Sequence, residues 1–245
     1  MAKIKKTLKK IGRYTWELFK SSIPAALMYF CAGAVLMMLT MKDVEKLQWD
    51  NNALMWTLIC GIAACAYNGL VMWANGGNQY EMLVSGNVKR TSMDEYGMGY
   101  KMSNHKEAKE YRVWKGFAIG GFAAIYTIIF AIVFGCNQSA IDTQQLSGGA
   151  LSVFVLIGMF LSGWTILPFY YANLNGAAVS YFLTALFALL PIVISGVFYI
   201  IGAYARRNKA IRQQELADKA AKAEAEKVKK INYGGLPGTK PKKRK

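Results

Sequence analysis

Histidine, cysteine and acidic residues are scarce in this chain of 245 residues, which contains one His, four Cys and 14 Asp or Glu. Cys60 and Cys65 are five residues apart, so on a helix they would point in different directions rather than hold one metal ion. His105 lies in a polar segment, so the apolar segments can hold neither a zinc helix nor a serine–histidine pair. The polar segments contain no phosphate-binding glycine loop. We therefore expect a protein that is not an enzyme and that needs no cofactor or metal.

Charged residues are missing from five long apolar segments. Each has at least 19 residues, which at about 1.5 Å per residue can cross a hydrocarbon core about 30 Å thick. A charge at the bilayer centre costs at least about 2.5–3.5 kcal/mol, which explains why the segments contain no Asp, Glu, Lys, Arg or His. The apolar runs are continuous rather than alternating, which is typical of helices. We predict an all-α polytopic membrane protein whose apolar segments are residues 23–41, 53–74, 116–135, 150–172 and 177–205.

The charges between these segments predict which side of the membrane each polar part occupies. The net charge is +6 over residues 1–20, −1 over 42–52, +2 over 75–115, −1 over 136–149 and +10 over 206–245. Short segments rich in Lys and Arg stay in the cytoplasm. We therefore expect a multi-pass protein of the cell membrane with a cytoplasmic N-terminus and a cytoplasmic loop at residues 75–115.

The number of crossings is left open by the same rule. Helices 1 and 2 fall within residues 22–74, and helices 3 to 5 within residues 116–205. Five full spans would put the basic tail outside, against the charge rule. The alternative is four spans, with part of residues 150–205 re-entering the membrane around Pro168 and the polar turn at residues 173–176. Such irregular backbone is allowed at membrane depth where protein or a wet cavity covers it.

The polar segments predict surfaces rather than catalytic sites. Residues 1–21 have the periodicity of a basic amphipathic helix that lies on an anionic lipid surface. The sequence Asn75-Gly76-Gly77-Asn78 predicts a turn that closes the second apolar segment. Within the 75–115 loop, a helix is expected to start near His105 and to continue into the third segment. The residues expected to contact lipid or a partner are Lys5, Lys6, Lys9, Lys10, Arg206, Arg207, Lys242, Lys243 and Arg244.

The C-terminal tail is expected to have two parts. Residues 206–231 are rich in Ala, Lys, Glu and Gln and predict a solvated helix. Residues 232–245 contain Gly and Pro and end in a basic run, which predicts a disordered C-terminus. A nucleic-acid patch is a weak hypothesis for this run. Contact with anionic lipid or with ribosomal RNA is favoured over it, and a solvated end that only adds solubility is favoured over both.

A small set of polar and glycine residues lies inside or beside the apolar segments. The polar ones could line a path for a solute or could bond between helices, and the glycines predict close helix packing. The polar set is Asn68, Ser162, Thr165, Asn173 and Asn175. The glycine set is Gly116, Gly120 and Gly158.

These features favour a non-enzymatic accessory or scaffold protein that presents basic surfaces to anionic lipid, to a protein partner or to a second copy of itself. One alternative is a small permease or channel subunit for a neutral or hydrophobic solute. Another is a biogenesis factor whose tail contacts ribosomes. The plan of several spans with a basic helical tail resembles that of YidC-type membrane insertases. However, the charged membrane groove of that group has no counterpart here, so the resemblance carries no function over.

Overall fold

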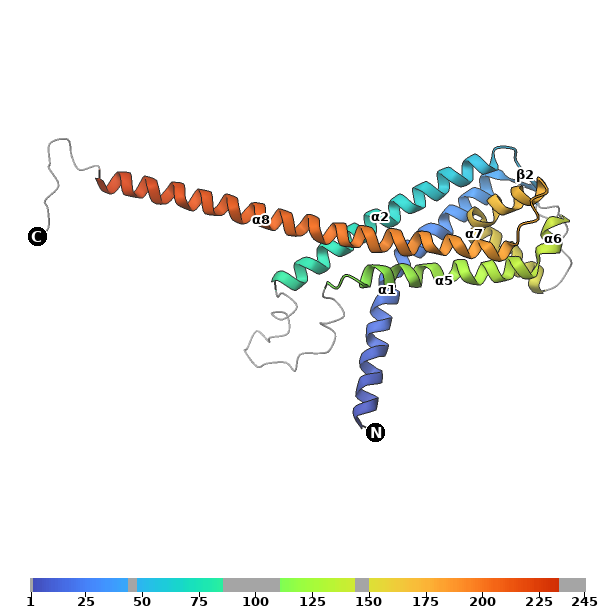
Figure 1. Cartoon of the computed structure of the whole chain (residues 1–245), viewed down its shortest axis with the longest axis horizontal. Coiled ribbons are helices and arrows are strands. Elements are labelled where there is room, and N and C mark those ends of the chain that lie inside the picture. Colours follow the sequence, from blue (N-terminus) through green and yellow to red (C-terminus); the bar gives the residue numbers. More distant parts are fainter. Residues whose placement is uncertain (1, 44–47, 86–110, 144–149, 234–245) are drawn as a thin grey trace, which may run out of the picture. The chain divides into compact units, whose positions relative to one another are not determined.

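The computed structural model describes residues 2–43, 48–85, 111–143 and 150–233 (Figure 1). Apart from one short hairpin, these residues are helical or lie in turns and connections, which confirms the predicted all-α class. Within these described residues, five helices are long and apolar enough to cross a membrane. The elements are α1 (Ala2–Thr40), β1 (Met41–Asp43), β2 (Gln48–Trp49), α2 (Ala53–Ser85), α5 (Lys115–Cys136), α6 (Gln138–Asp142), α7 (Ala150–Leu174), η1 (Tyr181–Ala188) and α8 (Leu189–Tyr233).

The chain forms two compact units, which are described separately. Met1–Ala203 form a helix bundle, and Tyr204–Lys245 form the second unit. In the second unit, the described part of α8 is helical to Tyr233, and its side chains are exposed as far as residue 227. A helix that is polar and exposed all round is what the Ala, Lys and Glu content of residues 206–231 predicts.

One end of the bundle, named here the Asp50 end, is marked by contacts around two aspartates. The backbone N–H of Asp50 donates to the carbonyl oxygen of Thr40 at 2.8 Å, and Asp50 precedes the first turn of α2. The Tyr181 hydroxyl, at the start of η1, donates to the Asp142 carboxylate at 2.7 Å. The end of α1, the start of α2, the end of α6 and the start of η1 therefore share this end.

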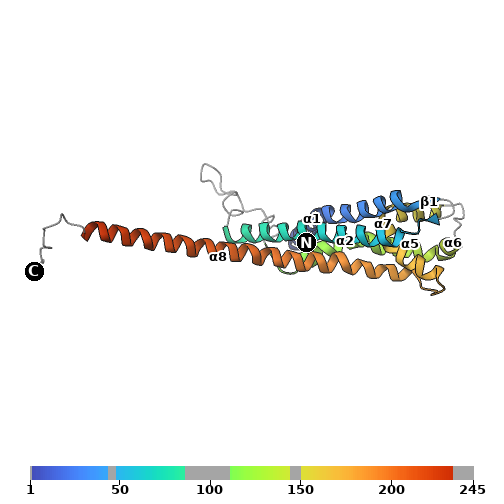
Figure 2. The same cartoon turned by 90° about the horizontal axis from the view of Figure 1, so that it is seen from above.

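The opposite end, named here the Lys115 end, is held together around Gln79 of α2. The Gln79 side-chain oxygen accepts a hydrogen bond from the Lys115 ammonium at 2.9 Å and another from the Tyr199 hydroxyl at 2.7 Å. Tyr14 of α1 packs its ring 5.6 Å from Trp114. Four elements, α1, α2, α5 and η1–α8, thus run from one end of the bundle to the other, as Figure 2 also shows.

Helix α7 does not run from end to end, because it bends back at Ser162. This residue has non-helical angles, φ −139° and ψ 21°, and it separates two helical limbs. The first limb begins at Ala150, soon after Asp142. The returning limb ends at the same end of the bundle, where Tyr171 donates to the carbonyl oxygen of Asp50 at 3.0 Å. Figure 1 shows both ends of α7 beside α6 and β2.

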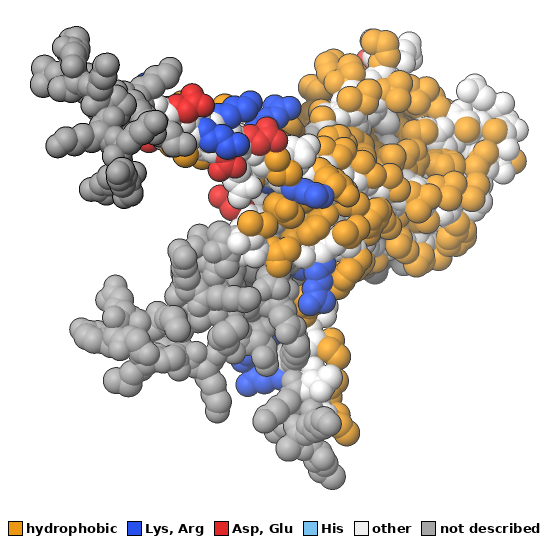
Figure 3. Space-filling view, turned by 60° about the vertical axis from the view of Figure 1, so that its left-hand side comes forward, with side chains coloured by type: hydrophobic (Ala, Val, Ile, Leu, Met, Phe, Trp, Pro, Cys, Tyr) orange, Lys and Arg blue, Asp and Glu red, His pale blue; other side chains and the backbone are white. Residues whose placement is uncertain are grey.

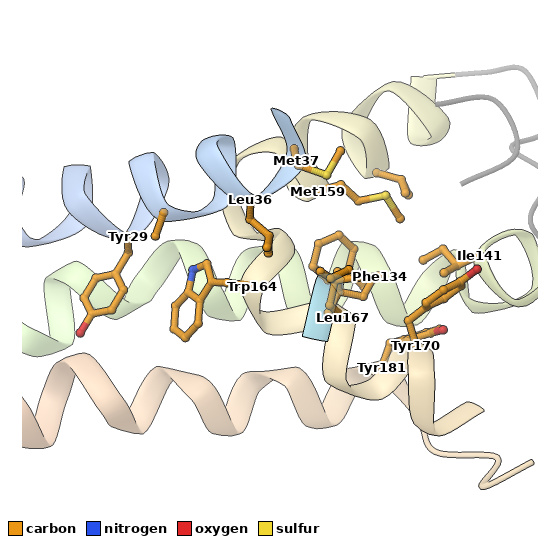
Figure 4. Close-up of a cluster of buried hydrophobic side chains, with 14 of the residues drawn as sticks. Tyr29, Leu36, Met37, Phe134, Ile141, Met159, Trp164, Leu167, Tyr170 and Tyr181 are labelled. Carbon is orange, nitrogen blue, oxygen red and sulfur yellow. The ribbon is translucent and has the colours of Figure 1, made fainter. Parts of the chain in front are cut away.

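The turn of α7 lies about halfway along the bundle. Next to it are Gly33 of α1, which faces the backbone of Leu161 and Ser162, and Tyr29, whose ring stacks on Trp164 at 5.3 Å (Figure 4). Along α1, Tyr29 is eleven residues, or about 16 Å, from Thr40 at the Asp50 end, and fifteen residues, or about 22 Å, from Tyr14 at the Lys115 end. The two limbs of α7 therefore form a helical hairpin, and its break is at Ser162 rather than at Pro168 or in the turn at residues 173–176.

Two local predictions about the 75–115 region are wrong. Residues 75–78 do not form a turn, because α2 continues through them to Ser85. Gly76 is instead the point where α2 approaches the backbone of Tyr199 so closely that a side chain would overlap its carbonyl oxygen. The helix predicted to run from His105 through Trp114 into the third apolar segment is not continuous. Residues 111–114 are not helical, and α5 begins only at Lys115. Residues 86–110, including the expected helix start, lie outside the described residues.

The basic N-terminal segment and the first apolar segment form a single helix rather than two elements. Helix α1 runs from Ala2 to Thr40 with Pro24 inside it. Ile4, Leu8 and Ile11, the apolar stripe expected to lie on lipid, are 56–66% exposed. Among the α1 side chains that the structure describes, the first one buried is Leu18, which packs with Tyr199.

Candidate functional site

A buried polar cluster joins three helices near the turn of α7. Asn68 of α2 donates from its amide to the Ser195 hydroxyl of α8 at 3.1 Å and to the Tyr29 hydroxyl of α1 at 3.3 Å. The Ser195 hydroxyl and the Asn68 side-chain oxygen are 3.2 Å apart, and the Tyr29 hydroxyl lies 3.8 Å from the Cys65 sulfur. Asn68, Ser195 and Tyr29 are fully buried. We name these four residues the Asn68 cluster.

Three further polar side chains lie beside this cluster, on α5 and on the returning limb of α7. Tyr126, Thr127 and Trp164 are 9%, 1% and 2% exposed. The Tyr126 hydroxyl faces the Thr127 side chain and the Trp164 indole. Among the described residues, none of the three polar atoms has a partner that meets both the distance and the angle of a hydrogen bond. We name these residues the Trp164 triad.

Ser162 and Thr165 stabilise the turn of α7. Their hydroxyls are 3.0 Å apart, and the Thr165 hydroxyl also donates to the Ser162 carbonyl oxygen at 2.7 Å. Breaking a helix leaves backbone groups without their helical partners, and in an apolar environment these groups need other hydrogen bonds. The Thr165 hydroxyl provides such a bond to the Ser162 carbonyl oxygen. Their contacts therefore explain both residues structurally, without a solute.

Asn173 and Asn175 lie at the Asp50 end and do not join the other predicted polar residues. Asn173 accepts a hydrogen bond from the Val179 N–H at 2.5 Å, and its amide donates to the Val179 carbonyl and to Asp142. Asn175 is exposed. The five predicted polar residues therefore divide among the Asn68 cluster, the α7 turn and the Asp50 end.

An ion pair also lies at the Asp50 end. The Lys42 ammonium is 2.7 Å from the Asp50 carboxylate. The hydrogen bond and positive charge of Lys42 hold the pKa of Asp50 below its usual value. Both side chains are partly or largely exposed, so this pair contributes little to stability.

An apolar cavity of about 630 Å³ opens between α2, the returning limb of α7, and α8. Such a volume is within the range of about 300–1,000 Å³ that is usual for small-molecule sites. Gly61 borders it, and a methyl group added there would meet only the Trp164 ring, at 3.9 Å. Its lining residues are Thr57, Leu58, Gly61, Ile62, Cys65, Ala66, Trp164, Pro168, Phe187, Leu190, Ile194 and Phe198. Figure 3 shows the apolar side chains that cover the face of the bundle in view.

The three predicted packing glycines all lie at helix contacts. A methyl group at Gly116 would come within 2.7 Å of the Tyr199 side chain, and one at Gly120 within 2.5 Å of the Pro191 carbonyl oxygen. Gly158 on the first limb of α7 faces the ring of Phe130, where the distance would be 2.7 Å. Gly116 and Gly120 therefore lie where α5 meets α8, and Gly158 lies where α7 meets α5.

The structure describes some of the basic residues that were predicted to contact lipid or a partner. Lys9 is exposed on α1, and Arg206 and Arg207 are exposed on α8 in the second unit. Lys5, Lys6 and Lys10 belong to α1. Lys242, Lys243 and Arg244 lie outside the described residues, so their roles stay predictions.

The sequence interpretation missed two residues that matter to the site. Lys115 is fully buried, although it was counted among the charges of a polar loop. The sequence interpretation treated Trp164 only as one residue of an apolar segment and gave it no role in a site. Its position was a usable signal, because tryptophans of membrane helices gather at the two interfaces and Trp164 lies near the middle of its segment.

Comparison with known proteins gave no match to a family model, to a curated protein or to a solved structure. Function must therefore be argued from the bundle itself. Within the described ranges, no three His, Cys, Asp or Glu side chains are grouped as metal ligands.

Proposed function

We propose that this protein is a non-enzymatic accessory or scaffold protein of the cell membrane that crosses the bilayer four times. The observation that carries the proposal is the hairpin of α7, whose two ends both lie at the Asp50 end of the bundle. With α7 re-entrant, an even number of crossings remains. The first residues of α1 and the last bundle residues of α8 then lie on one side of the membrane.

The charge distribution supports a cytoplasmic location for that side. The two segments that flank the Asp50 end, residues 42–52 and 136–149, each carry a net charge of −1. Residues 1–20, 75–115 and 206–245, which contain or adjoin in the sequence the helix ends at the Lys115 end, carry +6, +2 and +10. Four crossings place all three basic segments inside, as the positive-inside rule requires, whereas five would place the most basic one outside.

Basic segments gathered on the cytoplasmic face would bind the anionic inner leaflet. Each Lys or Arg near such a surface contributes about 1 kcal/mol, and the effect decays within about 8–10 Å at physiological salt. Exposed Lys9 and Arg13 of α1 are suited to this contact. The loop and tail would then present a scaffold surface to a protein partner or to a second copy of the chain, and ribosome contact by the tail is the competing role.

Replacing Lys9 by Gln is expected to weaken the binding of phosphatidylglycerol about fivefold, because one favourable charge of about 1 kcal/mol is lost. The measurement is native mass spectrometry of the protein from micelles that contain equal amounts of phosphatidylglycerol and phosphatidylcholine. Lys42→Gln is the matched control, since Lys42 is a basic residue at the opposite end and is paired with Asp50. Equal lipid loss in both variants would contradict the proposal.

A small permease for a hydrophobic solute is the second candidate function. The observation that favours it is the cavity of about 630 Å³, whose lining is almost entirely apolar. None of the lining residues is charged, which favours an uncharged solute and argues against coupling to protons through an ionisable side chain. Leu58 and Ile62 at its edge are exposed, so the cavity opens on the outer face of the bundle, which lipid would cover in a membrane.

If the cavity carries a solute, Gly61→Leu is expected to abolish most of the flux, because the leucine side chain would fill the space beside Trp164. The measurement is uptake of a fluorescent hydrophobic dye into proteoliposomes. Gly121→Leu is the control, since nothing lies within 4 Å of a side chain added at Gly121. Flux in Gly61→Leu equal to that of the control would remove this candidate.

A further inference from the structure

The Trp164 triad places three polar atoms together without partners in the core of the bundle. The Tyr126 hydroxyl, the Thr127 hydroxyl and the Trp164 indole nitrogen are all buried and unpaired among the described residues. Buried polar groups in proteins almost always have a hydrogen-bond partner, and an exception calls for an explanation such as a bound molecule. The neighbouring Asn68 cluster shows the usual behaviour, since Asn68, Ser195 and Tyr29 bond to one another.

We infer that the Trp164 triad is a binding site for a small neutral molecule that forms hydrogen bonds, such as water or an uncharged polar solute. This inference is independent of the scaffold function proposed above. The site is built from α5, which supplies Tyr126 and Thr127, and from the returning limb of α7, which supplies Trp164 immediately after the hairpin turn.

The donor and acceptor chemistry defines the ligand. The indole N–H can only donate, so the ligand must present an acceptor to Trp164. The hydroxyls of Tyr126 and Thr127 can donate or accept, so they tolerate either a hydroxyl or a carbonyl group. The apolar segments around the site contain no charged side chain, which excludes an ion as a favourable ligand.

The surrounding packing limits the size of the ligand. The Trp164 ring lies 5.3 Å from the ring of Tyr29, and the Tyr126 ring lies 4.4 Å from that of Phe30. A molecule of the size of water, with two to four polar partners, is the type that occupies such positions in protein interiors.

Trp164 also separates the site from the apolar cavity. Its six-membered ring borders the cavity next to Gly61, whereas its nitrogen is buried at the triad. Figure 4 shows the indole at the turn of α7 beside Tyr29.

The first test is the sign of a stability change. If the triad holds a ligand, Tyr126→Phe and Thr127→Val each lose a hydrogen bond and lower the melting temperature in detergent, and Thr127→Ser restores it. If the atoms are dry and empty, removing them relieves a desolvation penalty, so an unchanged or raised melting temperature overturns the proposal. Thr57→Val is the control, because the buried Thr57 hydroxyl donates at 2.8 Å to the Ala53 carbonyl of its own helix, and this carbonyl keeps its acceptor role in the helix backbone when the hydroxyl is removed. We expect only a small change there.

If one of these variants does not fold, nuclear magnetic resonance of the wild-type protein tests whether the Trp164 triad binds a ligand. The indole N–H resonance of Trp164 is assigned by its absence in Trp164→Phe. A nuclear Overhauser effect between this proton and a long-lived water identifies water as the ligand. A shift of this resonance on adding formamide, with the exposed indole of Trp16 unshifted, identifies a neutral solute site. The absence of both signals overturns the proposal.

Discussion

Gly76→Ala is expected to destabilise the bundle by about 3 kcal/mol. Overpacked positions cost typically about 1–3 kcal/mol, and this one should lie at the upper end because the new methyl group would overlap the Tyr199 carbonyl oxygen, which is backbone and cannot rotate away. Gly202 faces the Trp73 carbonyl oxygen in the same way from α8. The two glycines therefore set the close crossing of α2 and α8, and either substitution should separate the helices.

The measurement is the melting temperature of the detergent-solubilised protein, followed by the monodisperse fraction after heating. Gly121→Ala is the matched control, because it also lies inside a membrane helix and has no atom within 4 Å of the added methyl group. Alanine favours helix over glycine by up to about 1 kcal/mol, so the control should be as stable as the wild type or slightly more so. Wild-type melting of Gly76→Ala would show that α2 and α8 do not cross in the way described.

Gly33→Ala is expected to displace the hairpin of α7 and to cost about 2–3 kcal/mol. Its methyl group would lie 2.6 Å from the backbone carbonyl of Leu161 and 2.9 Å from the nitrogen of Ser162, so the turn must move away from α1. Moving the turn also disrupts the stacking of Trp164 on Tyr29. The expected signature is a lower melting temperature together with a changed near-ultraviolet circular dichroism spectrum.

Gly12→Ala is the control on the same helix, since a methyl group there meets nothing within 4 Å. It should leave the spectrum unchanged and the melting temperature unchanged or slightly raised, because alanine favours helix over glycine. If Gly33→Ala behaves like this control, α7 does not turn against α1, and the case for a re-entrant α7 is lost.

The sequence predicted the fold class because the bilayer imposes a simple rule. Long segments without charge must be helical when they enter lipid, and the positions of the charges identified them directly. The positive-inside rule also indicated that the conflict over the number of crossings arises within residues 150–205. It could not identify the residue at which helix α7 breaks. Pro168 and the polar turn at residues 173–176 were the expected positions, whereas α7 breaks at Ser162. There the Ser162 hydroxyl is 3.0 Å from that of Thr165, and Gly33 of α1 leaves room for the turn.

Tertiary contacts explain the failed local predictions. Gly76 and Gly77 indicate a turn in isolation, but in the bundle Gly76 allows α2 to approach α8, and the helix continues. The site was predicted only in part for the same reason. Asn68 was selected as a polar residue in an apolar segment, while its partners Tyr29 and Ser195 come from helices 39 and 127 residues away. Sequence spacing contains no information about such pairs.

The side of the membrane on which Lys245 lies is the most direct test of four crossings. Two fusions of the full-length chain are compared in cells, one to a fluorescent protein that folds in the cytoplasm and one to alkaline phosphatase, which is active outside it. With α7 re-entrant and both basic ends inside, the fluorescent fusion is expected to be bright and the phosphatase fusion inactive. An active phosphatase with a dark fluorescent fusion would mean that α7 crosses the membrane, and it would contradict the account.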